Sequence, residues 1–156
     1  MAIIREYRPK LEENGLVIMN ENGCFRPSTK KISSSQDAVN ILEAIGLREE
    51  PEEFFVVLCM NASGQVIGFF RNSSGCTNAC FASPRECLRK ALLLNAISVI
   101  IAHNHPGGTC NPSREDINLT RTMKEAFNAI DIKLLDHIII PSYSNDYYSF
   151  AEHMEI

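Results

Sequence analysis

The chain has 156 residues, of which 45% are hydrophobic and 22% are charged, and its formal net charge is −4. This length suffices for one domain with a buried core, and the composition is that of an ordinary soluble globular protein. The acidic balance does not support a broad basic surface for nucleic acid, and no apolar run approaches the ~20 residues of a membrane helix. The amino-terminal residues MAIIRE lack the pattern of a signal peptide. We therefore expect a cytoplasmic protein without membrane contact.

The six cysteines of the chain raise the question of disulfides and of zinc binding. Reduced thiols are the default in a cytosolic protein, and none of the cysteines forms a C-x-x-C pair. Cys76 and Cys80 lie four positions apart, but no second pair completes a zinc site. We therefore expect reduced cysteines that play no part in metal binding.

The first part of the chain, residues 1–31, is polar apart from the apolar run LVIM at 16–19. Asn-Gly pairs flank this run at 14–15 and 22–23. Because Asn-Gly pairs favour tight turns, the pattern predicts a strand or a hairpin at the edge of a sheet.

Residues 33–46 show a helical pattern. Serines at 33–35 offer an N-cap, apolar residues then recur at helical spacing, and Gly46 supplies a stop signal. These signals predict a short helix over about residues 36–45. Together, the strand or hairpin and this helix form a predicted N-terminal extension, residues 1–47, ahead of a domain at 48–156.

The domain predicted at 48–156 alternates between β-rich apolar runs and helical patterns. An Asn-Ala-Ser-Gly turn between the first two runs predicts a β-hairpin, and small polar residues at 71–83 predict a loop. We expect an α/β or α+β fold, a single domain whose curved mixed β-sheet is flanked by helices. The predicted elements are strands at 54–60 and 65–70, a helix from Pro84, a strand at 97–102, a helix from Ser113 and a strand at 133–140.

The stretch ISVIIAHNHPGGTCNPSRED, residues 97–116, carries the strongest functional signal. Side chains alternate between the two faces of a strand, so His103 and His105 are predicted to share one face while Asn104 points away. Two imidazoles at this spacing can bind one cation if a further ligand approaches them.

The helix predicted to follow supplies such a ligand. Ser113 and Asp116 have the spacing of an N-cap and a first-turn acidic residue, which is in itself an ordinary helix start. An Asp held in a capped first turn also has little freedom left to lose on binding a metal. Glu115, the local competitor, points about 100° away on the helix.

These residues resemble a known signature. His103-x-His105, seven residues, Ser113, two residues and Asp116 resemble the zinc signature of JAB/MPN-type metalloproteins. More narrowly, HNHPGG, PSREDINLT, PRECLRKALLLNAISVIIAHNH and LLDHIII…YYSFAEH are similar to the JAB domain of RadC-type proteins, over about residues 53–152. Gly107 departs from the family, which usually has Ser after His-Pro. Longer members carry a preceding helix-hairpin-helix region, for which residues 1–50 show no counterpart.

The resemblance implies a JAB/MPN, cytidine-deaminase-like fold and a zinc-dependent hydrolase. His103, His105 and Asp116 are implied to hold one Zn²⁺ per chain, with water at the fourth position. The implied reaction cleaves an amide or isopeptide bond of a peptide or protein substrate. Ser113 is implied to donate a hydrogen bond to the oxyanion of the tetrahedral intermediate.

The family draws its general base from a Glu at the start of an upstream strand. Glu53, just before the run FFVVLCM, matches that position, and the adjacent Glu52 is the nearest rival. From the residues alone, both acidic groups are equally well explained as solvated charges of a linker.

Two other candidates carry less weight. His137 follows Asp136, but neighbours on a strand face opposite ways, so they form no dyad and His137 is predicted to be a satisfied core or rim histidine. Cys110 lies in the same loop as the predicted ligands, yet a fourth protein ligand would close the site.

The alternative function is a DNA-repair-associated, DNA-binding or adaptor module of the RadC type, with a structural or non-peptidase zinc site. The complete set of predicted site residues argues against a decayed site, and the net charge of −4 does not support nucleic-acid binding.

Overall fold

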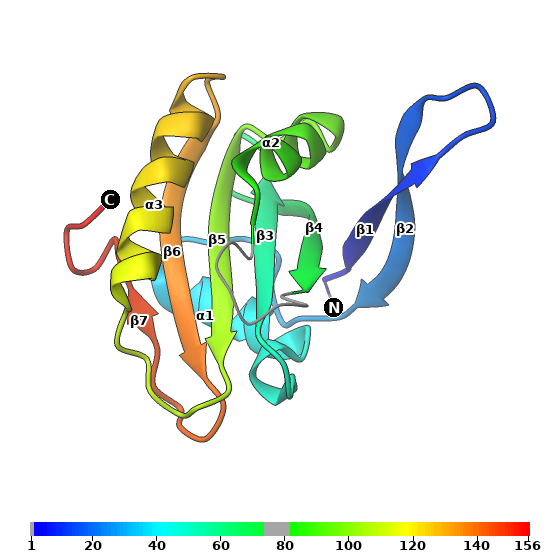
Figure 1. The fold of residues 1–156 in the computed structure, drawn as a ribbon. Coiled ribbons are helices and arrows are strands. Elements are labelled where there is room, and N and C mark those ends of the chain that lie inside the picture. Colours follow the sequence, from blue (N-terminus) through cyan, green and yellow to red (C-terminus); the bar gives the residue numbers. More distant parts are fainter. Residues whose placement is uncertain (1, 74–81) are drawn as a thin grey trace.

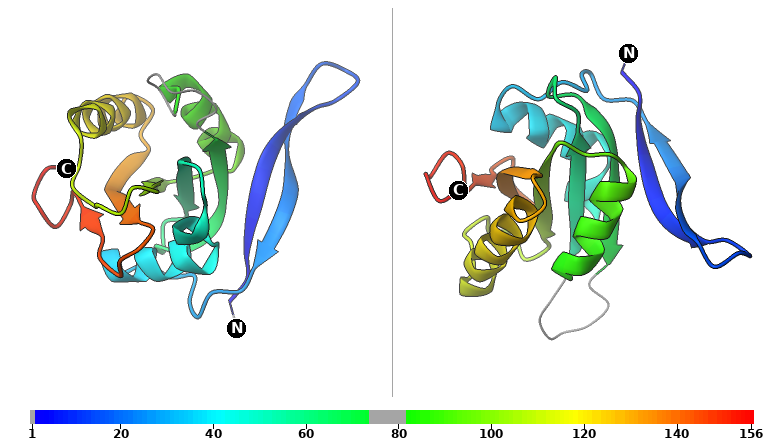
Figure 2. Two further views of the ribbon diagram at one scale, coloured as in Figure 1. Left: turned by 60° about the horizontal axis from the view of Figure 1, so that its bottom comes forward. Right: turned by 90° about the horizontal axis from the view of Figure 1, so that it is seen from above.

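A seven-stranded mixed sheet forms the centre of the computed structural model, which describes residues 2–73 and 82–156. The strand order is β2-β1-β4-β3-β5-β6-β7, and helices cover both faces of the sheet (Figures 1 and 2). The predicted α+β fold with a mixed sheet is confirmed. The strands are β1 (Ile4–Leu11), β2 (Val17–Phe25), β3 (Phe54–Met60), β4 (Val66–Ser73), β5 (Ser98–His105), β6 (Lys133–Pro141) and β7 (Tyr148–Ser149), and the helices are α1 (Ser35–Ala44), the 3₁₀ turn η1 (Leu47–Glu49), α2 (Pro84–Leu93) and α3 (Arg114–Asn128).

The predicted amino-terminal hairpin is formed by β1 and β2, which pair antiparallel. Gly15 closes its turn with a φ of 83°, a left-handed conformation that glycine adopts readily. The second Asn-Gly pair makes no turn. Asn22 is the extra residue of a β-bulge opposite Glu6 and Tyr7, and a bulge bends a strand without ending its pairing.

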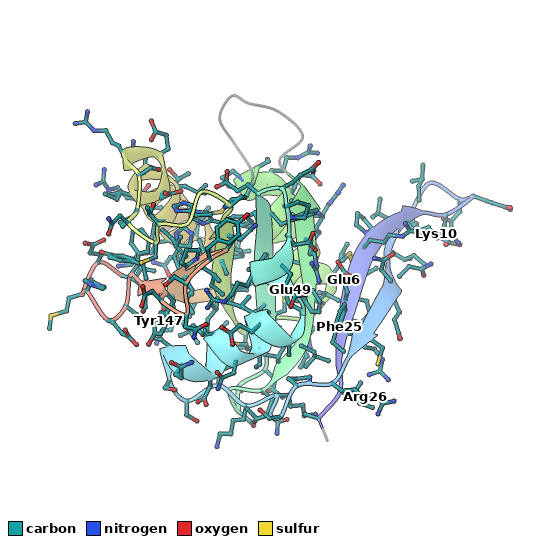
Figure 3. All side chains as sticks on the ribbon, turned by 90° about the horizontal axis from the view of Figure 1, so that it is seen from below. Glu6, Lys10, Phe25, Arg26, Glu49 and Tyr147 are labelled. Carbon is teal, nitrogen blue, oxygen red and sulfur yellow. The ribbon has the colours of Figure 1, made fainter. Side chains whose placement is uncertain are left out.

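The hairpin of β1 and β2 projects from one edge of the sheet (Figure 1) and is anchored at its base. Glu6 pairs with Phe69 of β4. Arg71 of β4 forms an ion pair of 3.2 Å with Glu6, and its guanidinium lies 5.8 Å from the centre of the Phe25 ring. Figure 3 shows Lys10 far along the hairpin from both Glu6 and Phe25.

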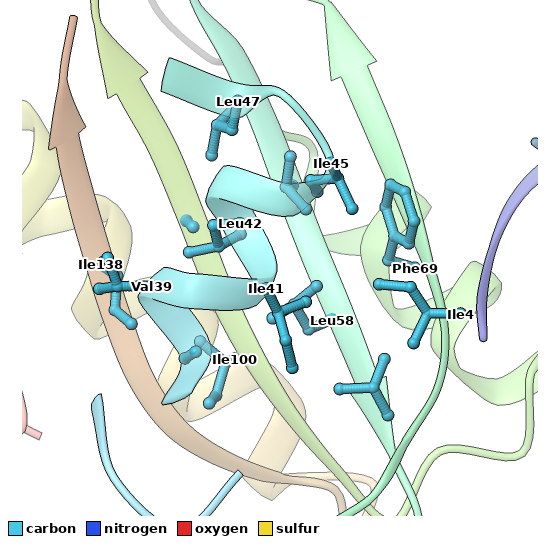
Figure 4. Packing of buried hydrophobic residues seen from close by; sticks show 14 of the residues in the cluster. Ile4, Val39, Ile41, Leu42, Ile45, Leu47, Leu58, Phe69, Ile100 and Ile138 are labelled. Carbon is cyan, nitrogen blue, oxygen red and sulfur yellow. The ribbon is translucent and has the colours of Figure 1, made fainter. Parts of the chain in front are cut away.

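The two faces of the sheet bury separate apolar clusters, because alternate residues of each strand point to opposite sides. In β3, Phe55 packs with residues of α2 and α3, whereas Leu58 packs with residues of α1. Both faces of this strand are therefore buried, as its unbroken apolar sequence FFVVLCM requires. Figure 4 shows Ile41 and Leu42 of α1 close to Leu58.

Helix α1 confirms the helix predicted at 36–45 and belongs to this core. Ser34 caps it and forms a capping box with Asp37, and Gly46 follows its end with a φ of 78°. Because α1 shares one apolar cluster with β3 and β5, the predicted extension and the predicted domain share one core. The division between residues 1–47 and 48–156 stays a prediction.

The remaining elements follow the predicted order. β3 and β4 form the predicted hairpin, Pro84 opens α2, and Ser113 caps α3. The strand predicted at 97–102 is longer than expected, since β5 extends through both histidines to His105. None of the helices within residues 2–73 and 82–156 has the length and hydropathy that crossing a membrane requires.

Most of the loop predicted at 71–83 lies outside the described residues, as do Cys76 and Cys80. The cysteines that the structure describes form no disulfide with one another, and the reduced state of the chain stays a prediction. These are Cys24, Cys59, Cys87 and Cys110.

Candidate metal centre

The two histidines of β5 lie on one face of the strand and approach each other closely. Their Nε2 atoms are 2.9 Å apart. Asn104, between them, points to the opposite face, where its side chain binds main-chain atoms of residues 50–54. The predicted alternation of side chains in this strand is therefore confirmed.

Asp116 reaches the histidines from the first turn of α3. Ser113 caps this helix, and its main-chain N–H and its hydroxyl both donate to Asp116 Oδ2, at 2.7 Å each. The other carboxylate oxygen, Oδ1, lies 3.2 Å from His103 Nε2, and Oδ2 lies 3.6 Å from His105 Nε2. The helix cap thus fixes one oxygen of Asp116 and directs the carboxylate at both imidazoles.

Glu53 comes to the same place from β3. β3 runs antiparallel to β5 and pairs Phe55 with His103. The start of β3 therefore lies beside the end of β5, where these strands reach the bottom of the sheet in Figure 1. Glu53 lies two residues before Phe55 and so shares its face, and its Oε1 is 3.9 Å from His103 Nε2. Glu52 is exposed. The register of β3 therefore brings Glu53, and not its neighbour, to the histidines.

Glu53, His103 and His105 together offer ligand atoms that all lie within 4.8 Å of one another. His105 Nδ1 lies 2.8 Å from the carbonyl oxygen of Thr109. Because a carbonyl only accepts, Nδ1 carries the hydrogen and Nε2 of the neutral ring has the lone pair. Two nitrogens held 2.0–2.1 Å from one tetrahedral ion are about 3.3 Å apart. The corresponding distances here are 2.9 Å between the two histidines, 3.2 Å from His103 to Asp116 Oδ1 and 3.6 Å from His105 to Asp116 Oδ2, so they lie on either side of the value for a zinc ion.

The protonation of these groups follows from burial and from mutual contact. Burial raises the pKa of Asp116, but the contacts with His103 and His105 and the hydrogen bond from Ser113 outweigh it and hold the pKa far below its usual value. Burial lowers the pKa of His105, yet the contacts with Asp116 and Thr109 raise it overall. Burial raises the pKa of Glu53, and the two histidines only partly offset this rise.

The hydroxyl of Ser113 is engaged within the helix cap. It donates to Asp116 Oδ2 and accepts from the Asp116 main-chain N–H at 3.1 Å. Donation to an oxyanion therefore requires the hydroxyl to turn away from Asp116. That role of Ser113 stays a prediction, while its role as the N-cap of α3 is observed.

Asn104 is a positioning residue that the sequence did not reveal. Its Oδ1 accepts from the main-chain N–H of Phe54 at 2.7 Å, and its Nδ2 donates to the carbonyls of Glu50 and Glu52 at 3.2 and 2.8 Å. These bonds fix the segment that carries Glu53. The position of Asn104 between two histidines predicted only that its side chain points away from them. Its hydrogen-bond partners could not be predicted from the sequence, because they lie about 50 residues earlier in the chain.

We expect Asn104→Ala to lower the free energy of unfolding by about 2–3 kcal/mol, because partly buried main-chain groups of Glu50, Glu52 and Phe54 lose their partner. Denaturant unfolding measures this change. Asn14→Ala, which removes one hydrogen bond in the exposed hairpin turn, is the control and should lower it by less than about 1 kcal/mol. Equal losses for the two variants would contradict the assignment.

His137 of β6 lies behind His103, where the sequence predicted only a satisfied core or rim histidine. It is fully buried, and its Nε2 is 2.9 Å from His103 Nδ1. Burial lowers its pKa well below the usual value, and His103 adds to this effect. Asp136 binds Ser35 and Ser149 instead, so the two neighbours form no dyad, as predicted.

Two positions in the loop between His105 and Ser113 were singled out from the sequence. A Cβ built at Gly107 would meet no atom within 4 Å, so the site has room for the Ser that the family usually carries there. Cys110 is only partly buried and is a free thiol.

Comparison with known proteins finds matches over most of the chain. Residues 32–155 match the model of the RadC-like JAB domain. A UPF0758 protein of Paraburkholderia xenovorans is 38% identical over 122 residues, 78% of this chain and 47% of that protein. UPF0758 proteins of Pseudomonas syringae (43% over 94 residues, 60% of this chain and 42% of the relative) and Burkholderia vietnamiensis (45% over 107 residues, 69% and 40%) are also similar.

This chain spans less than half the length of these curated relatives, whose names describe no activity. The match nevertheless includes every residue of the centre described above, and it covers most of the chain. The chain belongs to the RadC-like JAB domain family.

Proposed function

We propose that the protein is a zinc-dependent hydrolase that cleaves an amide bond, a peptide or isopeptide bond, in a peptide or protein substrate. The observation that carries this proposal is the convergence of His103, His105 and Asp116 on one point with Glu53 beside them. Two imidazoles and one carboxylate are a ligand set of catalytic zinc sites, which keep a position open.

His103 Nε2, His105 Nε2 and Asp116 Oδ1 would hold one Zn²⁺ per chain. When bound, zinc lowers the pKa of a water molecule and polarises a carbonyl group. Glu53 would accept a proton at its carboxylate as the water attacks the amide carbonyl, and would then give this proton to the leaving nitrogen. A raised pKa suits both transfers, because a general base works best near the ambient pH.

The sequence alternatively suggested a DNA-repair-associated or adaptor role with a structural zinc site. A structural site uses four protein ligands. Here His105 Nε2 and Asp116 Oδ1 lie 2.9 and 3.2 Å from His103 Nε2, whereas Glu53 Oε1 lies farther from it, at 3.9 Å. This arrangement favours an open site, and the DNA-associated role is retained only as an outcome of the experiment below.

The proposal predicts about one zinc per chain in purified protein, and loss of amide hydrolysis after chelation with recovery when zinc is added back. Elemental analysis measures the metal, and a panel of linear peptides and Lys-isopeptide conjugates measures cleavage. Cleavage that survives complete removal of zinc would contradict the proposal. Salt-dependent DNA binding by a zinc-loaded protein without hydrolase activity would favour the alternative.

A further inference from the structure

A chain of buried hydrogen bonds leads from α3 through β6 to His103. The Thr120 hydroxyl lies 2.7 Å from the main-chain oxygen of Asp116. Because a carbonyl oxygen can only accept, the hydroxyl hydrogen of Thr120 points to that oxygen. Thr120 Oγ1 therefore acts as an acceptor toward any other partner.

That other partner is His137. Its Nδ1 lies 2.6 Å from Thr120 Oγ1, so Nδ1 must carry the hydrogen. Full burial disfavours the charged imidazolium, and a neutral ring has only one N–H. His137 Nε2 therefore has a lone pair, which faces His103 Nδ1 at 2.9 Å.

The same reasoning fixes His103. Its Nδ1 carries the hydrogen that His137 accepts, so the lone pair of the neutral ring is on Nε2. His103 Nε2 is the atom that faces His105 Nε2 and Asp116 Oδ1. Each tautomer thus follows from the one before it, starting at a main-chain carbonyl whose role cannot change.

We propose that Thr120 and His137 are positioning residues that hold His103 in the tautomer able to bind zinc through Nε2. This inference rests on the zinc site of the proposed function and not on hydrolysis. It also couples two ligands, because the chain starts at the main chain of Asp116 and ends at the ring of His103.

His137 also has a packing role, which the experiment must separate from its hydrogen bonds. Its ring stacks on Phe150 at a centroid distance of 4.8 Å and an angle of 8°, and it makes a T-shaped contact with Phe55 at a centroid distance of 6.3 Å. An aromatic replacement keeps most of these contacts. Thr120 permits a closer test, because Val has the same shape without the hydroxyl.

In Thr120→Val, His137 Nδ1–H loses its acceptor, so His137 favours the tautomer with hydrogen on Nε2. That hydrogen donates to His103 Nδ1 and shifts the His103 hydrogen to Nε2, where it opposes zinc. We expect the zinc affinity to fall about 10–100-fold, as for other residues that orient metal-binding histidines. Thr120→Ser restores the hydroxyl and should retain an affinity close to that of the unaltered protein.

Competition with a chromogenic chelator measures zinc affinity, and ¹⁵N NMR of the imidazole nitrogens reports the His103 tautomer in zinc-free protein. His137→Phe is the second variant and should shift the tautomer and affinity in the same direction. Unchanged affinity and tautomer in Thr120→Val, or an equal loss in Thr120→Ser, would overturn the inference. Because neither readout involves hydrolysis, an inactive protein that shows these shifts contradicts only the proposed function.

Discussion

Asp116→Asn is expected to lower the affinity for zinc by more than about 100-fold. This loss exceeds the roughly 10–100-fold loss that follows when a residue that only orients a ligand is removed. The Asn oxygen can replace Asp116 Oδ2 as the acceptor for Ser113, which preserves the helix cap. Its amide group then occupies the place of Oδ1, 3.2 Å from His103 Nε2. An amide N–H directed at the ion cannot act as a ligand, and the negative charge is lost.

The chain contains a matched control for this substitution. Asp37 forms the same capping box with Ser34 at the start of α1, where its Oδ2 accepts from the Ser34 main-chain N–H at 3.0 Å. Asp37→Asn therefore changes a cap of the same kind in a helix that packs on the other face of the sheet from the histidines. Isothermal titration should show unaltered zinc affinity for Asp37→Asn. Stoichiometric zinc in dialysed Asp116→Asn protein would refute the assignment of Asp116 as a ligand.

The parts of the centre that depend on local geometry could be predicted from the sequence. Two-residue alternation in a strand placed His103 and His105 on one face. The Ser-x-x-Asp spacing placed Asp116 in the first turn of a capped helix. Both patterns involve residues that are close in sequence, so the backbone conformation alone decides where the side chains lie.

The parts that depend on pairing between distant strands could not be predicted in this way. Choosing between Glu52 and Glu53 requires the register of β3 against β5, in which Phe55 pairs with His103. A sequence gives the alternation within each strand but not the offset between two strands. The resemblance to the family supplied this choice, and the register explains it.

The contact between His137 and His103 depends on an irregularity of β6. The pairing of β6 with β5 shifts by one residue, so that Leu134 pairs with Val99 and Asp136 with Ile100. Leu135 is the extra residue. Simple alternation from Leu134, whose side chain lies in the cluster of α2 and α3, places His137 on the face of α1. The bulge at Leu135 moves the following residues to the opposite faces, so that His137 lies on the face of α2 and α3 and points to His103.

Glu53→Gln is expected to keep zinc and to lower the rate of amide hydrolysis about 10²–10⁴-fold, the range associated with loss of a general acid–base group. Gln has nearly the same shape and can keep the position beside His103, but its amide neither accepts nor donates a proton during turnover. The substitution thus separates proton transfer from metal binding. We expect the zinc affinity of this variant to stay within about threefold of that of the unaltered protein, which would establish that the metal site is intact. A disturbed ligand shell would instead lower the affinity about 10–100-fold.

Glu52→Gln is the matched control, because it makes the same chemical change one residue earlier. Glu52 is exposed, and its carbonyl, which accepts from Asn104 Nδ2 at 2.8 Å, is unaffected by a side-chain substitution. Its hydrolysis rate should therefore equal that of the unaltered protein. Initial rates on one cleaved substrate, measured with all proteins fully loaded with zinc, compare the two variants. Normal turnover in Glu53→Gln together with loss in Glu52→Gln would move the base to Glu52, in conflict with the register of β3.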